Sequence, residues 1–220
     1  MRGAFVGLMA VVLAAGACAA PTAPGGPGPV VVSTGPGSST YRGAELDPAR
    51  AYPLPQVTLT DTSGQPYDLR TGSAARPATQ PVTVVFFGYS NCPDVCTGIL
   101  ADIAGAKNRL PPAQRAKVRV LLVTTDPARD TPPVLKAYLD RIDPEFIGLT
   151  GDLGVITSAA ESVGVPVTEA KQLPSGGYEV VHGTQVIGFG KDARAVVVWT
   201  NPTPLGDLKA DLETLMTRQG

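Results

Sequence analysis

Two nearly continuous apolar runs constrain the fold of this 220-residue chain more than any other feature. Residues 82–87 read VTVVFF, residues 118–123 read VRVLLV, and a segment with helical character lies between them at 95–110. Strands that are apolar on both faces are typical of parallel sheets covered by helices on each side. The order strand, helix, strand therefore predicts a β-α-β unit at the centre of an α/β domain.

Further elements extend this unit on both sides. Segments 56–60 and 65–69 alternate in polarity around the turn sequence DTSG, which predicts an N-terminal β-hairpin. We expect the pair 178–181 and 195–200 to close a central mixed sheet flanked by helices. The remaining expected elements are a strand at 146–149 and helices at 130–140, 152–163 and 205–217.

The N-terminal residues predict export. Arg2 is followed by an apolar run at 4–13, by small residues at 14–17 and by Cys18, a pattern typical of a secretory signal. Small residues directly before a cysteine resemble a bacterial lipoprotein processing site, which would leave Cys18 as a lipidated N-terminus on the outer face of the cell membrane. An uncleaved anchor is the alternative, but the run is shorter than the roughly 20 apolar residues that a spanning helix needs.

The composition divides the rest of the chain into a linker and one domain. Residues 19–45 are rich in Pro, Gly and Ser, which predicts a flexible linker, and residues 46–220 are predicted to form the folded domain. The formal net charge of −1 gives no basic surface of the kind that binds nucleic acid, so we exclude that class of partner.

Cys92 and Cys96 lie where the first apolar strand is followed by a helix. Thiols four residues apart in a first helical turn face the same side, and the partial positive charge of the helix N-terminus favours the thiolate. In an exported protein the default for such a pair is a disulfide, although a bridge closing so short a loop contributes little stability. The pair therefore has three interpretations: a dormant disulfide, a redox-active dithiol, or a clamp that holds a metal ion between the two sulfur atoms.

The single histidine of the sequence, His182, is the other candidate ligand. Two thiolates and one imidazole suit copper or zinc, and a site with three such ligands fits Cu(I), with Cu(II) also accessible. From the residues alone, His182 is equally well explained as a surface residue of a hairpin.

A thiol motif between the first parallel strand and the following helix resembles the thioredoxin fold. Thioredoxins have two residues between their cysteines, whereas this chain has three. The wider loop suits the binding of an ion between the sulfur atoms better than rapid disulfide exchange.

Three segments together resemble the SCO/SenC family: FGYSNCPDVC at 87–96, TTDPARDTP at 124–132 and LKAY at 135–138. The resemblance extends from about residue 46 to residue 208. It implies an exported, membrane-tethered, thioredoxin-like protein that binds copper and helps to assemble the dinuclear copper centre of cytochrome c oxidase. It also implies three copper ligands: Cys92, Cys96 and His182.

Two positions differ from the family pattern without changing a ligand. Thr97 replaces a proline that usually follows the second cysteine, and Val181 replaces an aspartate that is common before the histidine. The loss of that aspartate removes a group that could orient the imidazole ring.

Two functions remain open at this point. The first is a metallochaperone that receives copper from a donor and passes it to an oxidase subunit. The second is a thiol-disulfide oxidoreductase in which Cys92 attacks a disulfide of a partner and Cys96 resolves the mixed disulfide. A peroxiredoxin-like function is disfavoured, because a Thr-x-x-Cys motif is expected there and the chain has Ser90-Asn91-Cys92.

The polar run Asp126, Arg129 and Asp130 is expected to have a structural role. Asp-Pro and Asp-Thr-Pro sequences are ordinary turn and helix-cap chemistry. The run follows a parallel strand, so it is expected at the same sheet edge as the cysteines.

Overall fold

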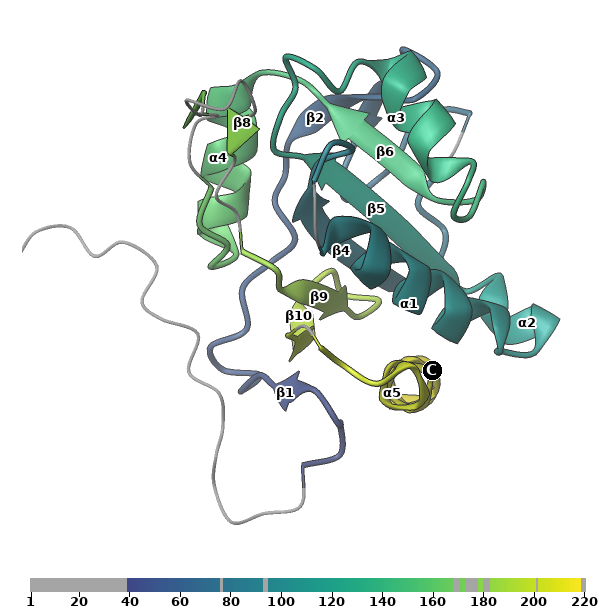
Figure 1. Ribbon diagram of the computed structural model, residues 1–220. Helices are drawn as coiled ribbons and strands as arrows, with labels where there is room; N and C mark the ends of the chain where they lie inside the picture. Colours follow the sequence, from purple (N-terminus) through teal and green to yellow (C-terminus); the bar gives the residue numbers. More distant parts are fainter. Residues whose placement is uncertain are drawn as a thin grey trace, which may run out of the picture.

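The structure is a computed structural model with one main sheet of eight strands (Figure 1). It describes residues 39–75, 77–92, 95–167, 171–172, 178–179, 183–200 and 202–218. The strand order is β1-β10-β9-β4-β5-β6-β2-β3. Its strands are β1 (Ala44–Glu45), β2 (Thr58–Asp61), β3 (Pro66–Asp68), β4 (Val82–Gly88), β5 (Val118–Thr124), β6 (Ile147–Thr150), β9 (Val186–Phe189) and β10 (Ala195–Trp199).

The centre of the sheet is parallel and fully buried. β4 pairs with β5 in parallel from Val82↔Val118 to Gly88↔Thr124, and β5 continues in parallel to β6. Every residue of β4 and β5 is buried, as the two apolar runs predict. The outer pairings are antiparallel, and they include the predicted hairpin of β2 and β3.

Helices cover both faces of this sheet. Alternate strand residues such as Phe86 pack with Leu100 of α1, and the next residue, Phe87, packs on the other face with Ile156 of α4. In Figure 1, α1 lies in front of the central strands, α3 lies at the upper right beside β6, and α4 lies to the left. The helices are α1 (Cys96–Asn108), α2 (Pro112–Arg115), α3 (Pro132–Leu139), α4 (Leu153–Ser162) and α5 (Leu205–Arg218). The predicted mixed sheet flanked by helices is confirmed.

The predicted closure of the sheet by segment 178–181 is wrong. β8 (Tyr178–Glu179) pairs with β7 (Lys171–Gln172) in a separate two-stranded sheet, and the partner of β10 is β9. β9 escaped prediction because Gly188 interrupts its short apolar pattern. Glycine is required at that point, since a Cβ there would lie 2.7 Å from Cη2 of Trp199.

The folded body begins earlier than the expected boundary at residue 46. Tyr41 is buried, and β1 adds a strand beside β10. The physical reason is a buried carboxylate on α5. Asp211 accepts hydrogen bonds from the backbone N–H groups of Arg42 and Gly43 at 2.7 and 2.8 Å, and from Nε1 of Trp199 at 2.7 Å.

Membrane-spanning helices are not found within the residues that the structure describes.

The Asp211 contacts predict a large effect of one substitution on stability. Asp211→Ala leaves three donors without their acceptor, which should lower the free energy of unfolding by about 3 kcal/mol. The matched control is Glu213→Ala on the same helix, which removes a partly exposed ion pair with Lys209 and should change stability by less than about 0.5 kcal/mol. Urea denaturation of both variants measures the difference. Equal stabilities of the two variants would contradict this account of β1.

Candidate metal centre

Two structural elements position the cysteines at one edge of the sheet. Cys92 lies in the loop that follows β4, and Cys96 is the first residue of α1. Its side chain packs against the end of β4, because a Cβ placed on Gly88 would lie only 3.2 Å from Sγ of Cys96. Pro93 and Asp94, between the cysteines, lie outside the described residues.

The two thiols contact each other. Neither cysteine of the described chain forms a disulfide, and the Cys92 side chain hydrogen-bonds the Cys96 thiol. Cys92 is half-buried, whereas Cys96 is completely buried. The pair is therefore asymmetric, with one sulfur accessible from solvent and one beneath it.

Burial dominates the protonation of Cys96. Removal from water raises the pKa of the Cys96 thiol, and the contact with Cys92 raises it further. A hydrogen bond from the Tyr89 backbone acts in the opposite direction but is weaker. Burial therefore outweighs the effect expected of the helix N-terminus, and the pKa of the Cys96 thiol in the metal-free protein is raised, not lowered.

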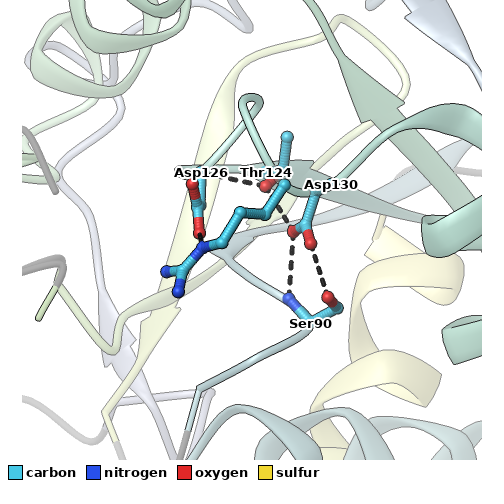
Figure 2. A network of polar contacts seen from close by, with 5 residues as sticks. Ser90, Thr124, Asp126 and Asp130 are labelled. Atoms are coloured by element: carbon cyan, nitrogen blue, oxygen red, sulfur yellow. Dashed lines mark hydrogen bonds and ion pairs between the residues drawn. The ribbon is translucent and has the colours of Figure 1, made fainter. Parts of the chain in front are cut away.

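A buried carboxylate fixes the loop that carries Cys92 (Figure 2). Asp130 has no exposed surface, and it accepts hydrogen bonds from the backbone N–H of Ser90 at 3.0 Å, from the Ser90 hydroxyl, and from the Thr124 hydroxyl at 2.6 Å. Ser90 precedes Cys92 by two residues, and Thr124 ends β5. Asp130 therefore ties the cysteine loop to the neighbouring strand.

The rest of the polar run stabilises the loop after β5. The buried Asp126 carboxylate pairs with Nε of Arg129, and the Asp126 backbone N–H donates to the Thr124 hydroxyl at 3.0 Å. The residue at the start of α3 is Thr131, without a side-chain cap. The structural role expected for the run agrees with these contacts, although Asp130 bonds across to Ser90 and does not cap a helix. Sequence spacing could not reveal this partner, because the two residues lie 40 positions apart.

Comparison with known proteins places this geometry in a family. The family model described as SCO1/SenC matches residues 55–217. This chain belongs to the SCO1/SenC family.

Several SCO1/SenC relatives align over most of the chain. A candidate copper-binding protein of Stutzerimonas stutzeri is 33% identical over 163 residues, which cover 71% of this chain and 76% of that protein. Apo Sco1 of Thermus thermophilus is 29% identical with a TM-score of 0.68, covering 80% of this chain and 96% of that one. Bradyrhizobium japonicum ScoI with copper bound is 27% identical with a TM-score of 0.60, covering 75% and 97%. The matched segment covers less than half of several mitochondrial relatives.

Thr97, which departs from the SCO1/SenC pattern, has a hydrogen-bond partner in the structure. The Thr97 hydroxyl lies 3.1 Å from the hydroxyl of Tyr138, which is buried on α3. Burial raises the pKa of Tyr138, with the contact to Thr97 opposing it. The pair joins the first turn of α1 to α3 by a hydrogen bond that proline at position 97 could not make.

The predicted third ligand, His182, lies outside the described residues, as does Cys18. Within the described part of the chain, no group of three His, Cys, Asp or Glu side chains could hold a metal ion. The chain directly after His182 is described. β9 pairs with β4 in the register Phe86↔Val186, so residues 183–185 lie at the edge of the sheet where β4 ends.

The asymmetry of the thiols predicts unequal reactivity. In the reduced, metal-free protein at pH 8, we expect iodoacetamide to modify Cys92 at least about tenfold faster than Cys96, because Cys96 is buried and remains protonated. Peptide mapping by mass spectrometry gives both rates. In urea the rates should become equal. Faster modification of Cys96 in the native protein would contradict the described geometry.

Proposed function

We propose that this SCO1/SenC protein is an exported, membrane-tethered metallochaperone that carries one copper ion on Cys92, Cys96 and His182. It receives copper from a donor and passes it by ligand exchange to the copper-site subunit of cytochrome c oxidase. The observation that carries this proposal is the contact between two reduced thiols at the sheet edge.

The donor set suits the cargo. Two adjacent thiols select soft ions, and an imidazole as third ligand leaves a coordination number that Cu(I) accepts. Copper must displace the proton of the buried Cys96 thiol, so binding releases protons and strengthens as the pH rises. The copper-bound state of ScoI, a relative with the same fold, supports copper as the ion.

The position of the chain near residue 182 supports His182 as the third ligand. Val186 pairs with Phe86, and four extended residues span at most about 14 Å. Thr184 also lines a small groove together with Ile99, which lies one helical turn after Cys96. These neighbours support the proposal that the His182 imidazole is the third ligand beside the thiols.

The N-terminal segment would hold this site near a membrane. Lipidation at Cys18 would anchor the protein on the outer face, and a flexible linker of about 20 residues has a root-mean-square reach of about 25 Å. This reach allows the cysteine edge to meet the exposed domain of a membrane-bound oxidase subunit.

The alternative function is a thiol-disulfide oxidoreductase. The observation that favours it is the difference in burial between the cysteines, since an accessible sulfur that attacks and a buried sulfur that resolves are what such an enzyme needs. Its substrate would be the disulfide form of the oxidase copper site or of another exported partner.

Copper titration of the reduced protein distinguishes the two functions. We expect one tightly bound equivalent, and we expect Cys92→Ser, Cys96→Ser and His182→Ala each to weaken binding by at least about 100-fold, which equals about 2.8 kcal/mol. The matched control is Asp140→Asn, which changes an exposed residue at the C-terminal end of α3. This variant should bind copper as tightly as the wild type does.

The same variants give the contrary outcome. If His182→Ala leaves copper binding unchanged while Cys92→Ser abolishes the reduction of a partner disulfide, the oxidoreductase function replaces the chaperone.

A further inference from the structure

A buried negative charge lies beside the candidate copper site. Asp130 has no exposed surface, and within the described residues its carboxylate pairs with no lysine or arginine. The hydrogen bonds that this carboxylate accepts from described residues come from uncharged donors on Ser90 and Thr124 (Figure 2). Donors of this kind carry no charge of their own, so they do not neutralise a carboxylate.

The Asp130 carboxylate acts on Cys96. Burial is the main cause of the raised pKa of the Cys96 thiol and of the Tyr138 hydroxyl, and the charge of Asp130 adds to it in both cases. Because the surroundings are buried, such an interaction is weakened less by solvent than it would be at the surface.

We propose that Asp130 is a specificity-determining residue that biases the site toward divalent over monovalent cargo, and so toward Cu(II) over Cu(I). The inference rests on the proposed copper function. A fixed negative charge near a bound cation stabilises each form in proportion to the charge of the cation. Cu(II) therefore gains about twice as much from Asp130 as Cu(I) gains.

Two substitutions separate the effect of the Asp130 charge from its effect on the position of the cysteine loop. Ser90→Ala removes one hydrogen bond from the cysteine loop and leaves the Asp130 charge intact. Asp130→Asn preserves the size of the side chain and removes the charge. A purely positional role would alter both oxidation states alike in both variants, whereas a charge effect changes their ratio only in Asp130→Asn.

The test measures the affinities of the full-length reduced protein for Cu(I) and Cu(II) by competition with chelators specific for each. Asp130→Asn should shift the ratio of affinities toward Cu(I) by about tenfold, equivalent to about 59 mV for one electron. Ser90→Ala should change both affinities by the same factor. Ag(I) and Cd(II), soft ions that do not oxidise thiols, should show the same ratio shift.

A second charge variant covers the case in which Asp130→Asn does not fold. Arg129→Gln removes the cation that pairs with Asp126 in the same loop, so it should shift the ratio in the opposite direction, toward Cu(II). Far-ultraviolet circular dichroism and thermal unfolding identify the variants that fold.

Two results would overturn the inference, and they differ in what else they overturn. An unchanged ratio in Asp130→Asn, or equal shifts in Asp130→Asn and Ser90→Ala, refutes the role of charge while the copper function stands. A wild-type protein that binds none of the four ions refutes the proposed function together with this inference.

Discussion

The parallel pairing of β4 with β5 is the constraint on which the candidate site depends. Because the two strands run in the same direction, their carboxyl ends meet at one edge of the sheet, and the loops that follow them lie side by side. One loop carries Cys92 and the other carries Asp130. The hydrogen bonds between Ser90 and Asp130 then tie the loop that carries Cys92 to the loop that carries the buried carboxylate.

The sequence could predict those parts of the fold that local pattern determines. The apolar runs of β4 and β5 are long, and no glycine interrupts them. Their continuous apolar pattern and their β-branched and aromatic residues therefore both indicate buried strands. β9 fails this criterion because Gly188 stands where the Trp199 ring requires space, a contact made only in the folded protein. The same limit applies to Asp130, whose partner Ser90 is set by tertiary structure.

The protonation state of the site shows how two physical effects compete. A helix N-terminus stabilises a nearby negative charge by about 0.3–1 kcal/mol, whereas removal of a charge from water costs several kcal/mol. The sequence places Cys96 at the helix start, but only the structure shows that it is completely buried. Burial therefore favours the protonated thiol in the metal-free protein, and a cation bound there would have to displace that proton.

X-ray absorption spectroscopy of the copper-loaded protein tests the central claim most directly, because it counts the atoms bound to copper. We expect two sulfur ligands from Cys92 and Cys96 and one imidazole nitrogen, with the nitrogen absent in His182→Ala. Copper bound through a single sulfur, or an unchanged nitrogen contribution in His182→Ala, would contradict this claim.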